Sequence, residues 1–318
     1  MSNRKLRLLL TAAISLLTVL SWGQDSRTVL NFLRLPVSAH VAALGGDNIT
    51  LQEDDASLLF HNPALLMGVT DGSLGLDIMT YMQGSVAAAA SYSQLCGGRG
   101  SWAVSGRFVN YGEMKETTYT GEQTGTFSAK DIAVGGTFAY DLTEHISGGI
   151  TGKVVTSYIG QYNSLAAAVD LGLCYYDPER EWSIGIVARN LGGQLTAYED
   201  DFEPMPLDLQ VGVSKRLVGS PLRFSATLVR LNDWQYGLGK HLVIGADLLL
   251  SQQFYLCAGY NPLRAHEMKI TSGDTESSHG AALSFGGGLQ LERLKLHVAY
   301  SRLHVSSPSL VANIAFTL

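Results

Sequence analysis

Segments that alternate apolar with small or polar residues fill the chain from Ser73 to Leu318, with turns or loops between them. Successive side chains of a β-strand point to opposite faces, so this period of two predicts strands with one apolar and one polar face. The segment 165–176 is the clearest case. Its apolar face would carry Leu165, Ala167, Val169, Leu171, Leu173 and Tyr175, and its other face Ala166, Ala168, Asp170, Gly172, Cys174 and Tyr176.

Fourteen segments follow this pattern. The predicted strands are 73–81, 85–94, 101–111, 128–140, 146–158, 165–176, 182–190, 207–216, 222–231, 242–250, 254–261, 281–291, 294–302 and 309–318. Most reach or approach the roughly 9 to 11 residues that a tilted strand needs to cross a membrane. An even number places both termini on one side of the membrane. The pattern therefore predicts an all-β fold, a 14-stranded antiparallel transmembrane β-barrel over residues 71–318.

The connections between these strands fall into two length classes that alternate. The short ones are 141–145, 177–181, 217–221, 251–253 and 292–293, and the long ones are 112–127, 191–206, 232–241 and 262–280. Outer-membrane barrels have short periplasmic turns and long external loops, so we expect the long connections at the cell surface. A two-sheet β-sandwich, the alternative for alternating strands, gives no reason for such asymmetry.

Aromatic residues near the predicted strand ends are typical of the girdles at the two interfaces of a membrane barrel, although some could be core residues. They are Trp102, Phe108, Tyr140, Tyr158, Tyr175, Trp182, Phe254, Tyr260 and Tyr300. The outer wall would then contact outer-membrane lipid.

Residues 1–23 are predicted to be an export signal rather than part of the fold. Three basic residues precede the apolar stretch 8–20, and small residues follow where a signal peptidase cleaves. Thirteen apolar residues are too few to cross a membrane as a helix. The mature chain would begin at Gln24 and reach the outer membrane of a Gram-negative bacterium.

Residues 24–70 interrupt the alternation and are predicted to form short helices and turns. The pair Asp54-Asp55 can cap a helix that runs through Phe60, and Asn62 before Pro63 has the pattern of a second N-cap. A barrel of this size has room for such a segment, so we expect a plug in the lumen or a cover on the periplasmic side. The motif of this plug consists of Pro36, Gly45, Gly46, Asn62 and Pro63.

The composition narrows the function classes. The net charge is −6, and loss of the basic signal residues makes the mature chain more acidic, which argues against nucleic acid as a partner. After Leu20 no stretch approaches 18 apolar residues, which excludes a helical membrane protein. Cys96, Cys174 and Cys257 are an odd number, so we expect buried small residues rather than a disulfide framework.

The candidate chemistry is sparse. Residues that could suggest a lumenal metal or catalytic site are His145, His297, His304, Asp170 and Asp247. Their spacing matches no ligand motif, and a Ser-His-Asp hydrolase would need a convergence that sequence cannot show. We therefore predict no enzyme activity, no cofactor and no metal. The acidic run 199–203 either solvates a surface loop, or binds a divalent ion or a basic partner.

Several motifs carry a resemblance to a known family. They are FLRLPVSA at 32–39, AALGG at 42–46, DDASL at 54–58 and NPALL at 62–66. These resemble the opening of the PorQ family, outer-membrane barrels of the type IX secretion system. Segments 125–131 and 190–192 are similar to the wider PorV and PorQ group. That group is in turn similar to the FadL long-chain fatty-acid transporters.

The resemblance implies a structural role. A PorQ-like barrel holds a PorZ-like surface protein near a PorU-like sortase and a PorV-like barrel, in the attachment complex that joins secreted cargo to lipopolysaccharide. His40 stands where the family would have a basic residue, and a neutral histidine there would weaken a charge contact. The alternative is a FadL-like transporter of hydrophobic molecules, which needs a continuous passage and an apolar pocket.

We expect the surface partner to dock on the external loops, chiefly 191–206 and 262–280. Interfaces draw most of their energy from a few aromatic or arginine anchors inside a polar rim. The candidate anchors in these loops and the adjacent one are Tyr198, Phe202, Trp234, Tyr236 and Arg264.

Overall fold

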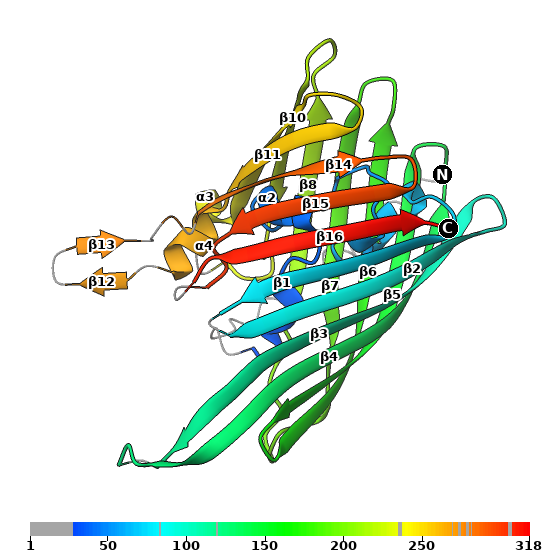
Figure 1. The fold of residues 1–318 in the computed structure, drawn as a ribbon. Helices are drawn as coiled ribbons and strands as arrows, with labels where there is room; N and C mark the ends of the chain where they lie inside the picture. The colour runs from blue at the N-terminus through cyan, green and yellow to red at the C-terminus, as the bar shows by residue number, and fades with distance from the viewer. Residues whose placement is uncertain are drawn as a thin grey trace, which may run out of the picture.

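A computed structural model describes residues 28–318 apart from 83, 119, 235–236, 269, 273–274, 278–279, 281 and 305–306, so the predicted signal lies outside the described residues. Fourteen strands form a closed barrel in the order β1-β16-β15-β14-β11-β10-β9-β8-β7-β6-β5-β4-β3-β2 (Figure 1). Their bounds are β1 Ser73–Tyr81, β2 Ser85–Cys96, β3 Gly100–Thr117, β4 Gln123–Asp141, β5 Ile146–Ile159, β6 Tyr162–Asp177, β7 Trp182–Thr196, β8 Asp208–Arg216, β9 Leu222–Leu228, β10 Leu242–Leu249, β11 Phe254–Tyr260, β14 Leu283–Gln290, β15 Leu294–Ser301 and β16 Ser309–Thr317.

All neighbouring strands pair antiparallel. The barrel is closed by the pairing of β1 with β16, in which Ser73 lies opposite Thr317 and Met79 opposite Val311. The predicted fold is therefore confirmed, and the sandwich alternative is excluded. We call the end where β1 begins and β16 ends the turn end, and the opposite end the loop end.

The loop end differs from the prediction in detail. β3 and β4 continue as a hairpin past the expected ends of these strands, so most of the predicted loop 112–127 is strand (Figure 1). Most residues of this extension are polar, so the strands continue without the alternation of apolar and polar residues from which they were predicted. The turn between β5 and β6 is also short, so the predicted alternation of connection lengths is not strict. The long connections contain α3 (Leu238–His241), α4 (Pro262–Glu267), β12 (Ile270–Ser272) and β13 (Thr275–Ser277).

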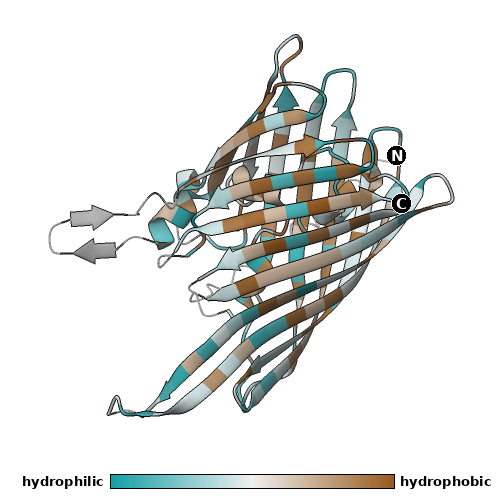
Figure 2. Ribbon diagram, in the orientation of Figure 1, coloured by the Kyte–Doolittle hydropathy of each residue, from teal (hydrophilic) through white to brown (hydrophobic). Residues whose placement is uncertain are grey.

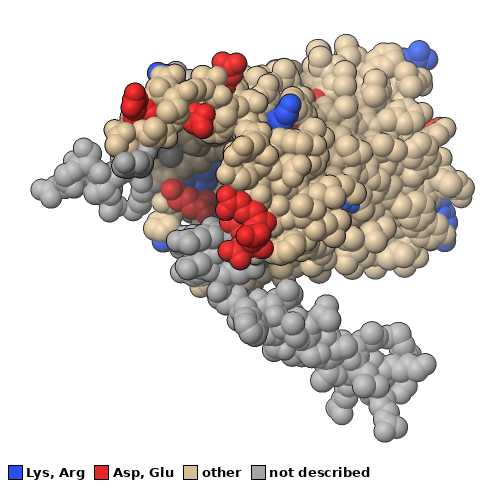
Figure 3. Space-filling model, turned by 90° about the horizontal axis from the view of Figure 1, so that it is seen from below, with Lys and Arg blue, Asp and Glu red and all other residues tan. Residues whose placement is uncertain are grey.

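The barrel places apolar residues outside and polar residues inside, the reverse of a water-soluble protein. In β6 the side chains of Leu171 and Leu173 are exposed while Asp170 is buried in the lumen, as the alternation predicts. Brown bands alternate with pale and teal bands along the strands (Figure 2), and the wall seen in the space-filling view carries few charged side chains (Figure 3). The exposed aromatics lie toward the two ends, Trp102, Tyr140, Tyr175, Trp182 and Phe254 at the turn end and Phe108, Tyr158 and Tyr260 at the loop end.

The N-terminal segment fills the lumen rather than covering one end. It contains η1 (Asn31–Arg34), α2 (Ala39–Ala43), η2 (Ala56–Phe60) and η3 (Pro63–Gly68), and almost all its residues from Phe32 to Leu66 are buried. The predicted caps are confirmed, because the side chain of Asp55 accepts from Ser57 N and that of Asn62 from Ala64 N. Among the described helices, none is long and apolar enough to cross a membrane.

The three cysteines are free thiols. Cys174 and Cys257 are buried, as expected, but Cys96 is exposed at the turn end of β2. The expectation of a buried role is therefore wrong for Cys96, because Cys96 lies on the same outward face of β2 as the exposed Ala90 and Gln94.

Candidate functional site

Glycines on the lumenal face of the wall form seats for the plug backbone. A Cβ added at Gly149 would lie under 3.0 Å from backbone atoms of Pro63 and Ala64, and one added at Gly259 would meet backbone atoms of Leu44 just as closely. A Cβ added at Gly185 would also meet plug backbone, at Ile49 O, whereas those added at Gly172 and Gly286 would meet plug side chains. The wall therefore lacks side chains where the plug passes closest to it.

The plug motif has matching constraints on the plug side. Gly45 and Gly46 have φ values of 104° and 91°, which favour glycine. A Cβ on Gly46 would collide with the guanidinium of Arg264. Asn62 caps η3 and donates from Nδ2 to Ile49 O at 2.9 Å. Pro36 is buried between η1 and α2, and Pro63 occupies the first turn of η3.

A four-membered charge cluster joins the plug to the wall beneath α2. His40 Nδ1 lies 2.7 Å from Glu53 Oε2, and His40 Nε2 lies 2.6 Å from Asp247 Oδ1. Arg223 donates to Glu53 and to Asp247, both at 2.7 Å. The ring of Tyr255 stacks on His40 with the centroids 4.1 Å apart. Two cations and two carboxylates therefore alternate around a closed ring.

His40 is charged in this ring. Both nitrogens face carboxylates, and only an imidazolium donates from both. Burial alone would lower the pKa of His40, but Glu53 and then Asp247 raise this pKa well above its ordinary value. The expectation of a neutral His40 is wrong. Its partners lie 13 and 207 residues away in the sequence, so the local pattern could not reveal them.

The stability of the protein should therefore depend on pH. Because folding raises the pKa of His40, its contribution is fully present below the unfolded pKa of about 6.5 and is lost as the pH rises through the folded-state pKa. The groups around the ring are Glu53, Asp247, Arg223 and Tyr255. We expect the urea midpoint to fall from about pH 6.5 upward. His40→Gln should lose this slope, and an unchanged slope would contradict a charged His40.

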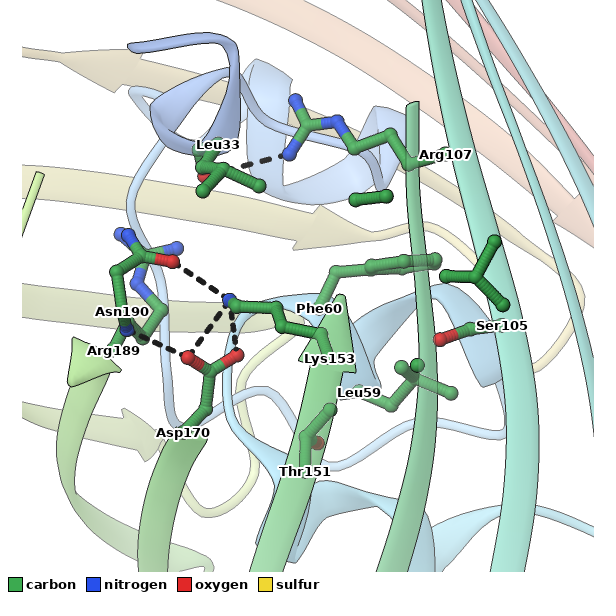
Figure 4. A pocket seen from close by; sticks show the side chains of 13 residues that line it. Leu33, Leu59, Phe60, Ser105, Arg107, Thr151, Lys153, Asp170, Arg189 and Asn190 are labelled. Carbon is green, nitrogen blue, oxygen red and sulfur yellow. Dashed lines mark hydrogen bonds and ion pairs between the residues drawn. The ribbon is translucent and has the colours of Figure 1, made fainter. Parts of the chain in front are cut away.

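A second cluster lies on the wall opposite η1 and η2 (Figure 4). Lys153 Nζ bonds both oxygens of Asp170, at 2.7 and 2.8 Å, and Asn190 Oδ1 at 2.6 Å. Asn190 has a φ of 61° at a bulge in β7 and donates its backbone N–H to Asp170 at 2.6 Å. A cavity of about 30 Å³ separates this cluster from the plug residues Leu33 and Phe60. It has room for about one water molecule.

Three carboxylates of the plug each face a cation of the wall. Glu53 meets Arg223, Asp54 meets Lys295, and Asp47 lies 3.4 Å from Arg189, which also pairs with Asp208 at 2.7 Å. Sequence reasoning considered histidines and aspartates but missed these cations. The sequence pattern that could have revealed these cations is their place on the inward-facing side of the alternating strands.

Cavities remain at both ends of the lumen. The turn-end cavity is about 780 Å³ and is lined by residues that include Glu53, Glu181 and Arg216. The loop-end cavity is about 120 Å³ and is lined by Arg34, Arg264 and others. These two and the inner cavity beside Lys153 share no lining residue.

The candidate residues for metal or catalysis are dispersed. Asp247 contacts His40, and Tyr255 stacks on His40 while its hydroxyl lies 2.6 Å from His297 Nδ1. Asp170 belongs to the Lys153 cluster, His145 is exposed in a turn, and His304 packs against Tyr81.

One group of side chains has the spacing of metal ligands. His40, Asp247 and Cys257 offer atoms within 4.8 Å of one another. Both His40 nitrogens already face carboxylates, and the guanidinium of Arg223 occupies Asp247 from the other side. The donor set therefore fits a protein cation better than a metal ion.

The predicted partner residues occupy different environments. Phe202 and Trp234 are exposed, at 65% and 62%, whereas Tyr198 is half-buried. Tyr236 lies outside the described residues. Arg264 is buried and bonds Gly45 O at 2.5 Å, so it is not a surface anchor and the expectation for it is wrong. The turn from β11 into α4 directs its side chain toward the plug.

Comparison with solved structures agrees on the fold. The chain is similar to the Pseudomonas putida toluene transporter TodX, at 15% identity and a TM-score of 0.56, over 88% of this chain and 96% of that one. A Pseudomonas aeruginosa FadL homologue is similar at 10% identity and a TM-score of 0.55, over 89% of this chain and 98% of that one. The CymD monoaromatic hydrocarbon channel is similar at 13% identity and a TM-score of 0.55, over 91% of this chain and 98% of that one. No family model and no curated protein matches.

Proposed function

We propose that the protein is an integral outer-membrane barrel with its loop end at the cell surface. The support is the apolar outer wall with aromatic residues toward both ends, the FadL-like fold, and the export signal predicted at 1–23. A lipid environment removes the cost of exposing such a wall, which water would impose. Both chain ends of the barrel would then lie in the periplasm.

We infer further that it is the anchor of a surface protein in the type IX attachment complex, as the PorQ resemblance implies. The observation that carries this proposal is the fastened plug, in which Asp47, Glu53 and Asp54 pair with cations of the wall. A lumen closed by buried ion pairs is expensive to open, because each broken pair leaves an unpaired charge. A surface anchor needs a rigid barrel and exposed loops, and it does not need an open channel through the lumen.

The experiment is affinity purification of the tagged barrel from membranes in mild detergent. A PorZ-like surface protein should come with it, and PorU-like and PorV-like proteins should follow more weakly. Recovery of the barrel alone from intact, secreting cells would contradict the anchor role.

The exposed aromatics Phe202 and Trp234 should carry the docking energy. Loss of a hot spot costs upwards of about 2 kcal/mol, so the double variant Phe202→Ala/Trp234→Ala should lower partner affinity at least about 30-fold. The measurement is partner recovery at equal barrel abundance in the membrane. Val218→Ala, an exposed residue at the turn end, is the control and should leave recovery unchanged. Equal recovery with the double variant would place docking elsewhere.

A second candidate is transport of hydrophobic molecules. It is favoured by the similarity in fold to the toluene transporter TodX and to the CymD monoaromatic hydrocarbon channel. An apolar hollow of about 530 Å³ on the outer face of β5 to β8, lined by residues such as Leu171, Ile186 and Val211, could hold such a solute. Toluene uptake by cells with and without the barrel separates the candidates, because an anchor leaves uptake unchanged.

A further inference from the structure

The loop-end cavity holds a concentration of charge that the anchor role does not use. It is about 120 Å³ in volume and lies between η1, α4 and the ends of β8 and β9. In the space-filling view, basic atoms are visible in a hollow among acidic side chains at one end of the molecule (Figure 3). Its charged lining residues are Arg34, Asp47, Asp208, Arg230, Arg264 and Glu267.

All three carboxylates of this lining already have cationic partners. Arg189, just below the cavity, pairs with Asp208 at 2.7 Å and with Asp47 at 3.4 Å. Arg230 forms a two-pronged pair with Glu267. The three acids therefore form their ion pairs with Arg189 and Arg230, and counted with Arg189 the cavity has four guanidinium groups against three carboxylates, a net charge of one positive unit.

The other two guanidinium groups have only neutral contacts. Arg264 donates from Nη1 to Ser301 Oγ at 2.8 Å and from Nη2 to Gly45 O at 2.5 Å. Arg34 donates from Nη1 to Asn31 Oδ1 at a long 3.4 Å, and its buried Nε has no partner. Within the described part of the chain, neither forms a salt bridge, and the cavity as a whole keeps one positive charge in excess.

A buried cation without a counter-charge is costly unless an anion or water compensates it. Burial and Arg230 lower the pKa of Arg34 by more than Asp208 and Glu267 raise it, and burial lowers the pKa of Arg264 by more than Asp47 and Glu267 raise it. We propose that this cavity binds a compact oxyanion, a carboxylate or phosphate group, between the guanidinium groups of Arg34 and Arg264.

The chemistry of the site selects this class of ligand. Guanidinium groups present planar forks of N–H donors that match carboxylate and phosphate oxygens. A volume of about 120 Å³ equals roughly four water molecules at about 30 Å³ each, enough for the anionic group but not for a long chain attached to it. The ligand is a free ion or the head group of an anionic lipid whose chains stay outside. The inference does not depend on the anchor role.

The test is calorimetric titration of the full-length purified barrel with inorganic phosphate in a neutral detergent. Arg34→Gln removes one guanidinium and should weaken binding about tenfold or more. Arg216→Gln is the matched control, because Arg216 lies at the turn end with a side chain 45% exposed and should bind as the wild type does.

Asn31→Asp is the sharper variant, because it builds a carboxylate beside Arg34 with the same side-chain shape, although it gives up the hydrogen bond from Asn31 Nδ2 to Thr28 O. This internal anion should raise the thermal midpoint in the absence of phosphate and weaken phosphate binding, whereas loss of folding alone would lower that midpoint. If phosphate binding to Asn31→Asp and Arg34→Gln equals that of the wild type, or the wild type binds none, the free-ion form of the proposal is overturned.

Lipid discs distinguish the two sources of the anion. Phosphatidic acid should raise the thermal midpoint of the wild type above its value in phosphatidylcholine, and Arg34→Gln should abolish this difference, if the ligand is a lipid head group. If free phosphate alone raises the midpoint, the ligand is a soluble ion. If neither raises it, the cavity holds only water and the proposal fails.

Discussion

Barrels carrying Gly149→Ala and Gly259→Ala should fold poorly or lose their plug. Each new methyl would lie against plug backbone, under 3.0 Å from Pro63 and Ala64 or from Leu44, and backbone cannot move aside as a side chain does. Overpacking costs about 1 to 3 kcal/mol per site. Distant sites add, so the double variant should lose about 2 to 6 kcal/mol, comparable with the whole stability of many domains.

The measurements are the urea midpoint and the rate of trypsin cleavage after Arg34 in the plug. Gly152→Ala is the matched control, because Gly152 lies in the same strand and a Cβ there meets nothing within 4 Å. Gly152→Ala should leave the urea midpoint and the cleavage rate close to those of the wild type. If Gly149→Ala and Gly259→Ala behave like this control, the plug is not seated on the wall as described.

Asp247→Asn should be the most destabilising single substitution in the charge ring. It leaves the cations of His40 and Arg223 facing the one carboxylate of Glu53, and breaking a buried pair costs about 3 to 5 kcal/mol. Part of this cost is relieved when His40 releases its proton. Because loss of Asp247 lowers the folded-state pKa of His40, the pH-dependent fall in stability should be smaller in the variant and end at a lower pH than in the wild type.

A double-mutant cycle identifies the ring as one unit. His40→Gln/Asp247→Asn removes one charge of each sign and keeps the pair of Glu53 with Arg223, so it should lose less stability than the two single variants added together. Glu181→Gln is the control, since its pair with Arg216 is exposed and 3.5 Å long and should contribute under about 1 kcal/mol. Strict additivity of the two ring variants would rule out the coupling.

The plug and the wall are constrained by two independent kinds of contact. Glycine seats set how closely the backbones approach, and ion pairs set which residues face one another. Together they would make the N-terminal segment a fixed part of the barrel, so that partner binding at the loops would not require the lumen to open. The observation that Arg264 bonds Gly45 links the loop end to the same fixed segment.

The sequence by itself determined the barrel. A period of two is a local property, so the exposed Leu171 and the buried Asp170 follow from their neighbours in the chain. The count of strands and the helix caps at Asp55 and Asn62 are local in the same way, and all agree with the structure. The sequence did not predict the extended hairpin of β3 and β4, because polar residues dominate there and Met114 and Phe127 are too few to show the alternation.

Only the tertiary structure decided what happens inside the barrel. His40 is charged because folding brings Asp247 to it across 207 positions of sequence, and no local pattern encodes that distance. Arg264 looked like a surface anchor because arginine in a loop usually is one, but the path of the chain into α4 turns it toward Gly45. The unbalanced charge beside Arg34 exists only when four segments meet at one end of the barrel. Strand pattern is local, whereas charge balance in a lumen depends on contacts between residues far apart in the chain.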